Sequence, residues 1–183
     1  IGFNDPWGDG IDKAFTALAG PANINIVANE RYARADTSVE AQVLKILAAK
    51  PDAVLIGGSG TPGALPAISL AGRGYKGAVY GNHGMVNPDF LRVGGKSVEG
   101  LIAPTGPLVV VELLPDSSPV KSIASSFVKA YDAAYGVQNR NAFAGYAYDA
   151  NVLLEKAAPE AMKTAKPGTP AFRAALRNAL ENL

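Results

Sequence analysis

Cysteine is absent from the sequence and histidine occurs once, and each scarcity excludes a kind of chemistry. Without a thiol, the 183-residue chain can form no disulfide, no thiolate nucleophile and no cysteine-ligated metal site. The single imidazole, that of His83, argues against a zinc cluster, because zinc sites combine several His and Cys ligands. We therefore predict no metal centre. The absence of cysteine leaves the cellular compartment open.

An excess of charge of one sign is also lacking. Seventeen Lys and Arg residues stand against sixteen Asp and Glu, with nine of each before Gly106 and eight basic against seven acidic after it. Binding to a phosphate backbone needs a basic surface, so neither half predicts a nucleic-acid partner. The most apolar stretch, 101–114, is interrupted by Pro104 and Pro107 and is too short to cross a bilayer.

Short apolar runs alternate with helical patterns from residue 1 to about 103. The segment 11–19 has apolar residues at helical spacing, and Thr37 and Glu40 have the spacing of a capping box at the start of another helix. The run 53–56 is apolar throughout, as in a parallel strand that is covered on both faces. The pattern predicts strands at 1–3, 24–27, 53–56, 77–80 and 100–103, and helices at 11–19, 37–50, 62–71 and 88–93. This alternation predicts an α/β fold with a parallel sheet.

The sequence from residue 107 onward is predicted to be almost entirely helical. Ser118-Pro119 has the pattern of an N-cap followed by proline, and Thr169-Pro170 repeats it. Between them, Pro159 is expected to kink or divide a long helix over 143–166. We therefore predict two parts, a parallel-sheet lobe over 1–106 and a helical segment over 107–183.

Both parts have the pattern of a fragment. Ile1-Gly2-Phe3 is typical of the tail of a strand, and no leader pattern precedes it, so we expect any targeting segment to lie upstream. Amphipathic helices without a sheet need an apolar partner. The helices of 107–183 are therefore expected to belong to an incomplete lobe, and the fragment is expected to self-associate or to bind its missing portion.

Three loops follow predicted strands and carry the candidate binding residues. They contain Trp7, the run Ser59-Gly60-Thr61, and Asn82-His83. Because the carboxyl ends of parallel strands share one edge, these loops should converge where open α/β sheets bind ligands. Trp7, in a polar and glycine-flanked loop, either stacks on a ligand or packs in the core. His83 either contacts a ligand or has no role, and no acid is evidently placed to make it catalytic.

The run Gly58-Ser59-Gly60-Thr61-Pro62-Gly63 matches a dinucleotide-binding pattern between a strand and a helix. Such a site also needs an acid after the next strand, where this sequence has 80–83 without a carboxylate, and Pro62 removes one backbone donor. Ser59 does not form a nucleophile elbow, because Thr61 stands where glycine is required. These departures count against a nucleotide- or NAD-dependent Rossmann-type enzyme that uses this turn. Because the glycine pattern itself matches, such an enzyme is kept as the alternative to a binding protein.

The chain resembles the periplasmic substrate-binding proteins of ABC transporters, branched-chain amino-acid (Leu/Ile/Val-binding) type, which have the type I periplasmic-binding-protein fold. The resemblance extends over essentially all 183 residues and is carried by segments 1–10, 42–46, 50–54, 73–77, 87–90, 98–100, 143–149 and 166–170. It implies that 1–106 is the C-terminal ligand-binding lobe, Rossmann-like, and that 107–183 returns into an incomplete N-terminal lobe. It also implies a periplasmic location and a membrane permease as partner.

The resemblance also assigns ligand contacts to individual residues. Trp7 corresponds to an aromatic residue of the cleft, Ser59, Gly60 and Thr61 to a ligand-contacting loop, and Phe143 to an aromatic residue from the other lobe. His83 lies where amino-acid-binding members place a carboxylate for the ligand ammonium, and Asn82 beside it is a further predicted ligand contact. Because a neutral imidazole compensates a buried ammonium poorly, we expect the ligand to be an organic or aromatic acid rather than a simple amino acid. The resemblance implies no cofactor and no catalysis.

Overall fold

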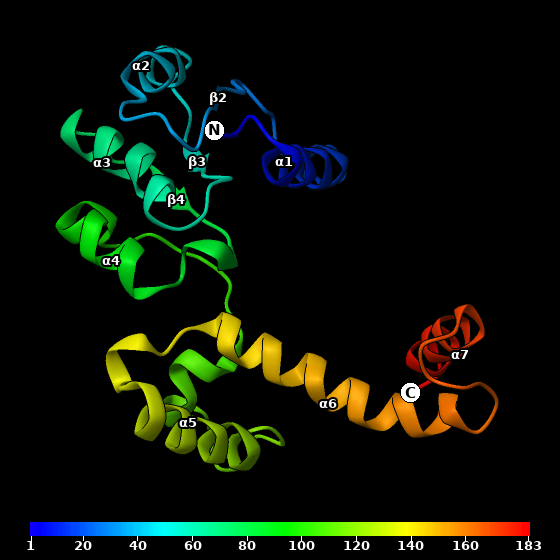
Figure 1. The fold of residues 1–183 in the computed structure, drawn as a ribbon. Coiled ribbons are helices and arrows are strands. Elements are labelled where there is room, and N and C mark those ends of the chain that lie inside the picture. The colour runs from blue at the N-terminus through cyan, green and yellow to red at the C-terminus, as the bar shows by residue number, and fades with distance from the viewer. The chain divides into compact units, whose positions relative to one another are not determined.

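Every strand pair of the chain is parallel. The structure is a computed structural model that describes residues 1–183, and Figure 1 shows its course. Strand β1 pairs with β2, and β3 pairs with β4. The strands are β1 (Gly2–Phe3), β2 (Arg31–Tyr32), β3 (Ala53–Leu55) and β4 (Ala78–Tyr80). The predicted parallel pairing is therefore confirmed.

Two isolated parallel bridges connect the two strand pairs and extend the sheet. Gly2 bridges to Gly57, just beyond β3, and Tyr80 of β4 bridges to Ile102. The resulting spatial order is β2, β1, β3, β4 and then the backbone at Ile102. Parallel neighbours of this kind place all strand carboxyl ends at one edge.

Helices follow the strands, as the alternation predicts. The α-helices are α1 (Pro6–Ala19), α2 (Glu40–Ala48), α3 (Ala64–Gly72), α4 (Pro88–Gly94), α5 (Lys121–Tyr135), α6 (Ala142–Met162) and α7 (Pro170–Glu181). Short 3₁₀ helices are η1 (Thr61–Gly63), η2 (His83–Met85), η3 (Gly95–Val98), η4 (Pro107–Leu113) and η5 (Val137–Asn139). None of these helices is long and apolar enough to span a membrane.

The chain divides into two compact units, Ile1–Ala142 and Phe143–Leu183. The first unit contains the sheet and helices α1 to α5, and the second contains nearly all of α6 together with α7. The α/β class with parallel strands and many helices is that predicted from the sequence. The predicted division at residue 106 stays a prediction about a longer, two-lobed protein.

Two hydrophobic cores form within the first unit, on either side of residue 106. The larger core is built around fully buried side chains of the strands and of α2 and α3, including Phe3, Tyr32, Val43, Ile56 and Leu70. Burial of each such side chain stabilises the fold by about 1.5–3 kcal/mol. The smaller core consists of Leu108, Val111 and Val128, where η4 packs against α5.

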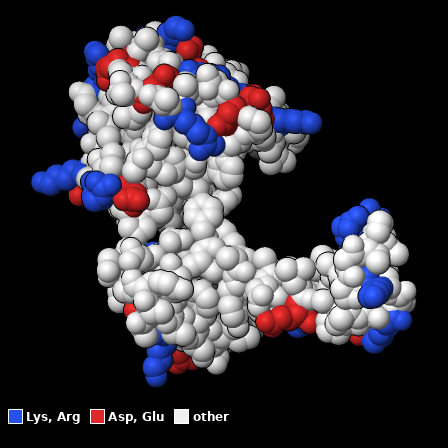
Figure 2. All heavy atoms as spheres, in the orientation of Figure 1, with Lys and Arg blue, Asp and Glu red and all other residues white.

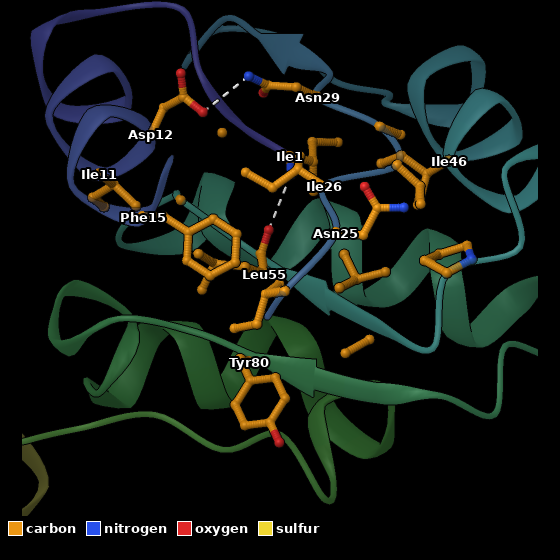
Figure 3. Close-up of a pocket in the computed structure, with 18 of the residues that line it drawn as sticks. Ile1, Ile11, Asp12, Phe15, Asn25, Ile26, Asn29, Ile46, Leu55 and Tyr80 are labelled. Carbon is orange, nitrogen blue, oxygen red and sulfur yellow. Dashed lines mark hydrogen bonds between the residues drawn. The ribbon is translucent and has the colours of Figure 1, made fainter. Parts of the chain in front are cut away.

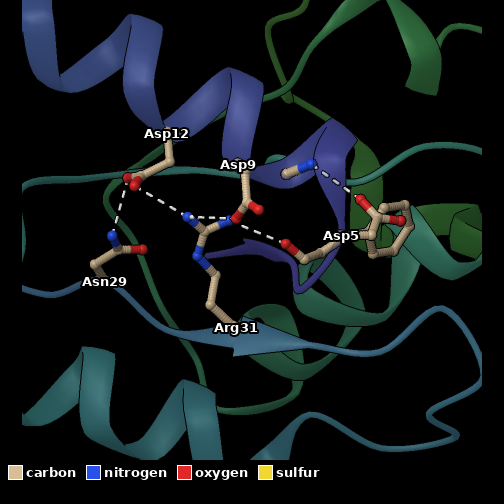
Figure 4. Close-up of polar contacts among 7 residues, drawn as sticks. Asp5, Asp9, Asp12, Asn29 and Arg31 are labelled. Atoms are coloured by element: carbon tan, nitrogen blue, oxygen red, sulfur yellow. Dashed lines mark hydrogen bonds and ion pairs between the residues drawn. The ribbon is translucent and has the colours of Figure 1, made fainter.

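An ion-pair cluster attaches α1 to the neighbouring strand β2. The Arg31 guanidinium lies 3.0 Å from Asp12 and 3.6 Å from Asp9, and it also donates a hydrogen bond of 3.0 Å to the Phe3 carbonyl oxygen. Asn29 donates to Asp12 at 2.9 Å (Figure 4). These contacts fix the start of α1, and with it Trp7, relative to the strand edge.

The predicted strand over residues 24–27 is wrong. Ile24, Ile26 and Val27 are exposed, and the strand that pairs with β1 is instead β2, with Gly2 opposite Arg31 and Phe3 opposite Tyr32. In this register residues 24–27 have no strand of the chain beside them. The apolar pattern was correct for a strand, but a strand also needs a partner for its backbone hydrogen bonds.

The predicted capping box of Thr37 and Glu40 is also wrong. Helix α2 begins at Glu40 itself, two residues later than the box requires, and its start has no side-chain cap. The Glu40 carboxylate instead accepts hydrogen bonds from Ser69 at 2.6 Å and from Arg73 at 2.6 and 2.9 Å. The Glu40 carboxylate thus bonds to Ser69 of α3 and to Arg73 just after α3, instead of to the backbone at the start of α2.

Three local predictions beyond residue 100 also need correction. Only Ile102 of the expected strand 100–103 joins the sheet, because Pro104 cannot continue a ladder. Ser118 accepts a backbone bond in a turn and α5 starts at Lys121, so Ser118 is not its cap. Pro159 lies inside α6 and does not divide it, while the alternative of a kink stays a prediction. By contrast, Thr169 does cap α7, accepting a hydrogen bond from the Phe172 N–H at 3.1 Å.

Candidate ligand-binding edge

The loops after β3 and β4 are joined by the side chain of Asn82. Its Nδ2 donates to the carbonyl oxygens of Ile56 at 3.1 Å and Gly58 at 2.7 Å, and its Oδ1 accepts from the Gly84 N–H at 2.8 Å. The last bond caps the 3₁₀ helix η2, which begins at His83. Asn82, predicted to contact a ligand, therefore has its amide engaged in holding the two loops together.

Gly84 is the point at which three candidate residues meet. A methyl group on its Cα would lie 2.9 Å from the Ser59 Cβ, 2.9 Å from the Asn82 Oδ1 and 3.0 Å from the Trp7 Cζ2. The Gly84 carbonyl oxygen also accepts a hydrogen bond from the Gly60 N–H at 3.0 Å. The predicted convergence of the loops after β1, β3 and β4 is thus present, and the absence of a side chain at Gly84 permits it.

Trp7 lies in the first turn of α1 and not in a loop, which corrects the sequence-based placement. Asp5 caps this helix by accepting from the Gly8 N–H at 3.1 Å, and Pro6 takes the first helical position. An N-cap Asp followed by Pro favours the start of a helix, and here the segment is helical despite the glycines that flank Trp7. The indole packs partly against the main core and meets the His83 ring edge-on, with centroids 5.4 Å apart.

The Trp7 indole N–H is buried without a hydrogen-bond partner in the protein. A buried donor of this kind costs free energy unless another group satisfies it. The indole therefore packs against the core, as one of the two sequence-based alternatives predicts. Its ring also contacts His83, and its N–H has no partner within the protein. Its contact with a ligand stays a prediction, as does that of His83.

Arg34 was missed in the sequence and belongs to the same edge. Its Nε donates to Asp5 Oδ2 at 2.5 Å, its Nη1 donates to Ser59 Oγ at 3.2 Å, and its guanidinium carbon lies 4.2 Å from the centroid of the Phe3 ring. Because the strand before it was predicted at 24–27, residue 34 did not count as a strand-end residue. The segment Glu30-Arg31-Tyr32 before it has no alternation of polar and apolar residues, so its sequence carried no clear signal of a strand.

Two ionisable groups at this edge have shifted pKa values. The hydrogen bond from the Gly8 N–H, and then the Arg34 guanidinium, hold the pKa of the Asp5 carboxyl below its ordinary value. Burial raises the pKa of the Tyr32 hydroxyl, which donates to the Pro62 carbonyl oxygen at 3.1 Å. Asp5 is therefore an anion and Tyr32 a neutral phenol at any physiological pH.

Two backbone N–H groups of the glycine-rich turn Gly58–Gly63 bond within the protein. The Gly60 N–H donates to Gly84, the Gly63 N–H donates to the carbonyl oxygens of Ser59 and Gly60, and Pro62 has no N–H. A methyl group at Gly58 would lie 2.5 Å from the Tyr32 hydroxyl oxygen, so packing requires glycine there. These engaged donors disfavour a phosphate cradle at this turn.

Thr61 and Phe143 complete the predicted set and lie in different surroundings. Thr61 starts η1 and is partly buried beside the glycine-rich turn. Phe143 is the first residue of the second unit, in the first turn of α6, where it is 45% exposed and meets the Tyr146 ring edge-on at 5.9 Å. The predicted ligand contacts of both residues stay predictions.

A cavity of the first unit lies away from the candidate residues. It has a volume of about 830 Å³ and is lined mainly by apolar side chains of α1, β3 and the segment 23–29. Figure 3 shows Ile11, Phe15, Ile26 and Leu55 around it. It lies beside the amino end of β1, where the Ile1 amine donates to the Leu55 carbonyl oxygen at 3.0 Å.

Charged side chains give no single-sign surface on the face drawn in Figure 2. Lys and Arg are interspersed with Asp and Glu over the first unit on that face. No group of three or more His, Asp or Glu side chains is placed to hold a metal ion. The strand edge therefore offers hydroxyl, aromatic and guanidinium groups to a ligand, with no metal cluster or evident nucleophile-base pair.

Comparison with known proteins gives a consistent family assignment. A family model described as "Periplasmic binding protein" matches residues 1–183. A solved structure from Rhodopseudomonas palustris (strain CGA009) is 46% identical, with a TM-score of 0.92, and the match covers 100% of this chain and 51% of that one. An extracellular ligand-binding receptor from Rhodopseudomonas palustris HaA2 is 45% identical, with a TM-score of 0.93 and the same coverage.

A more distant structure shares the fold alone. The leucine binding protein from Thermotoga maritima is 23% identical to the chain, with a TM-score of 0.76, over 98% of this chain and 47% of that one. None of the curated proteins compared matches the chain. The chain spans about half the length of the solved structures it matches.

Proposed function

Because the chain belongs to the periplasmic binding protein family, we propose that it supplies the ligand-binding edge of an extracytoplasmic solute receptor. In this proposal the whole protein captures a small organic solute between two lobes and delivers it to an ABC permease. Lobe closure around a bound solute would provide the signal that the permease reads. The extracellular ligand-binding receptor that is 45% identical to the chain supports this role.

The observation that carries the proposal is the meeting of loops from three strand ends. Trp7, Ser59 and Asn82 all approach Gly84, and the Trp7 ring contacts that of His83. These groups can bind a solute through hydrogen bonds and aromatic contact without changing it. Release of an unchanged solute is what a transport receptor requires.

We propose a small organic or aromatic carboxylic acid as the ligand, ahead of a branched-chain amino acid. The aromatic pair of Trp7 and His83 presents flat apolar surface, and Trp7 adds an unused N–H donor. The one carboxylate among these edge contacts, Asp5, already accepts from Gly8 and from Arg34. An amino-acid ammonium would therefore compete with Arg34 for the Asp5 carboxylate, whereas an acid without an ammonium group needs no anionic partner.

Calorimetry on the protein at its full natural length tests the function and the ligand class together. Benzoate and phenylacetate are compared with leucine and valine, and NAD and ATP are included for the alternative of a nucleotide-dependent enzyme. We expect an aromatic acid to bind tightly and the nucleotides to be inert. Tight binding of leucine or valine with inert aromatic acids would overturn the ligand class, and binding of NAD or ATP would overturn the receptor function.

A substitution at Trp7 separates its binding role from its packing role. Trp7→Ala is expected to weaken binding of the aromatic acid by at least tenfold, because both the ring contact and the indole N–H are lost. The melting temperature, measured by circular dichroism, controls for the fold. Unchanged affinity in a variant that melts much earlier would assign Trp7 to the core alone. Phe143→Ala tests the other predicted aromatic contact in the same assay.

A further inference from the structure

We propose that Arg34, together with the Ser59 hydroxyl, binds the carboxylate of the ligand. This inference rests on the proposed receptor function and names the group that would recognise an acid. Arg34 follows β2, Asp5 follows β1 and Ser59 follows β3, so three strand ends meet in this cluster. Guanidinium groups recognise carboxylates well because their planar N–H fork matches two carboxylate oxygens.

The Arg34 guanidinium is held in place before any ligand arrives. Asp5 binds its Nε, Ser59 binds its Nη1, and the Phe3 ring supports its face at 4.2 Å. Phe3 is fully buried and Asp5 is fixed as the cap of α1, so both supports belong to rigid parts of the fold. A positioned side chain loses less conformational entropy on binding than a mobile one.

The same contacts leave part of the fork available. Nε and Nη1 donate to protein oxygens, whereas Nη2 makes no hydrogen bond within the protein, and half of the side-chain surface is exposed. The Ser59 hydroxyl accepts from Arg34, so its own proton remains for a ligand oxygen. The exposed N–H and the hydroxyl proton together suit the two oxygens of one carboxylate.

The charges around Arg34 favour an anion over a cation or a zwitterion's ammonium. Asp5 is the one carboxylate that pairs with Arg34, while Asp9 and Asp12 pair with Arg31 on β2, the strand that precedes Arg34. Asp36, close in sequence, accepts from the Ala33 N–H at 2.8 Å. Ser59 also packs against Gly84, beside Trp7, which places the carboxylate-binding pair next to the aromatic groups. An acid with a flat apolar body fits this order of groups.

The test compares each acid with its neutral amide. Full-length protein is titrated by calorimetry with benzoate, phenylacetate and leucine, and with benzamide, phenylacetamide and leucinamide. For the acid that the unaltered protein binds most tightly, Arg34→Gln is expected to weaken binding at least tenfold and to change binding of the matching amide less than twofold. Arg34→Lys should recover only part of the loss, because an ammonium cannot reach Asp5 and Ser59 through separate nitrogens.

A second variant, Asp5→Asn, is expected to change the affinity for the acid in the opposite direction. Asp5→Asn keeps an oxygen for the Gly8 N–H and removes the counter-charge of Arg34, so affinity for the acid should rise severalfold while affinity for the amide stays the same. Arg92→Gln, at an exposed ion pair on α4, is the control and should change neither affinity. Melting temperatures establish that every variant is folded.

The outcomes separate the inference from the function on which it rests. If the unaltered protein binds an acid and Arg34→Gln binds it equally well, the role of Arg34 is overturned and the receptor function stands. An equal loss for acid and amide would assign Arg34 to shaping the edge, which also overturns carboxylate recognition. If none of the three acids binds, the proposed ligand class fails, and the inference about Arg34 fails with it.

Discussion

Gly84 lies at the centre of the proposed binding edge, and its role follows from its size. Three neighbours stand within 3.0 Å of the position that a Cβ would occupy there, namely Ser59, Asn82 and Trp7. Contacts this short require the neighbours to move, since folded proteins are close-packed. A glycine in this loop is thus needed for the close approach of side chains rather than for turn geometry.

Gly84→Ala is expected to destabilise the protein by about 1–3 kcal/mol and to weaken ligand binding, because Ser59 and Trp7 must shift. Gly10→Ala is the matched control, since Gly10 lies in α1 with nothing within 4 Å of a new Cβ, and it should stabilise by about 0.5–1 kcal/mol. Urea unfolding and calorimetry measure both effects. An unaltered affinity in Gly84→Ala would place Gly84 outside the edge.

Glu40 shows how a single carboxylate can make stability depend on pH. The hydrogen bond from Ser69, and then the Arg73 guanidinium, lower the pKa of the Glu40 carboxyl from its ordinary value of 4.5. A carboxyl with a lowered pKa in the folded state adds stability above its unfolded pKa. That contribution is lost as the pH falls through the folded value, when the carboxyl becomes protonated.

Glu40→Gln should therefore be less stable than the unaltered protein at pH 7, and the difference should shrink as the pH falls below about 4.5. The substitution also removes a favourable negative charge from the first turn of α2. Thermal melts between pH 7 and pH 3 measure the difference, with the exposed Glu99→Gln as control. A difference that stays constant over this range would show that the ionised carboxylate adds nothing.

At the scale of elements, the binding edge depends on side chains that connect one strand end with another. Asn82 connects the loops after β3 and β4 through two hydrogen bonds and caps η2 through a third, and Arg34 connects the ends of β1, β2 and β3. The strands themselves pair over only two or three residues each. Side-chain hydrogen bonds therefore do much to fix the positions of these loops relative to one another.

Asn82→Ala should cost about 1–3 kcal/mol, because two carbonyl oxygens and the Gly84 N–H lose their partner. Asn82→Asp keeps the acceptor for Gly84 but sets an oxygen against the carbonyl oxygens of Ile56 and Gly58. We expect it to be at least as destabilising at pH 7 and to recover in part near pH 3, where a protonated carboxyl can donate. Urea unfolding at both pH values tests this, and equal stability of Asn82→Asp at pH 7 would contradict it.

At the scale of the whole molecule, much apolar surface remains uncovered. Leu113 of η4 is 83% exposed and Ile123 of α5 is 63% exposed, and Tyr135 and Val137 are similarly exposed. Exposed apolar side chains of this kind favour association in water. These residues are therefore the candidates for the contacts of the self-association that the sequence predicts.

The 183-residue chain is expected to sediment as concentration-dependent oligomers in the micromolar range. Leu113→Glu combined with Ile123→Glu should shift it toward the monomer, because burying the new carboxylates at a contact is costly. Leu44→Glu, at an exposed position on α2, is the control and should leave association unchanged. A chain that sediments as a monomer at every concentration would contradict the expectation.

The sequence by itself determined the parallel α/β class and the loops at which to look for a ligand. Continuous apolar runs such as 53–56 and helical spacing such as 11–19 are local features, and the local chain needs little else to adopt them. The Thr169 cap of α7 was predictable for the same reason, since the donor and the acceptor lie three residues apart. The resemblance to solute-binding proteins rested on such local segments as well.

Only the tertiary structure decided which distant groups meet. Ser59 bonds to Arg34 across 25 positions, and Glu40 bonds to Arg73 across 33, so no local rule could find either pair. Distant partners likewise decided two wrong predictions. Glu40 bonds to α3 and the residue after it instead of forming the capping box, and β1 pairs with β2 instead of with residues 24–27. Hydrogen bonds and ion pairs depend on distance in space, and the packing of α1, α2 and α3 around the strands sets those distances.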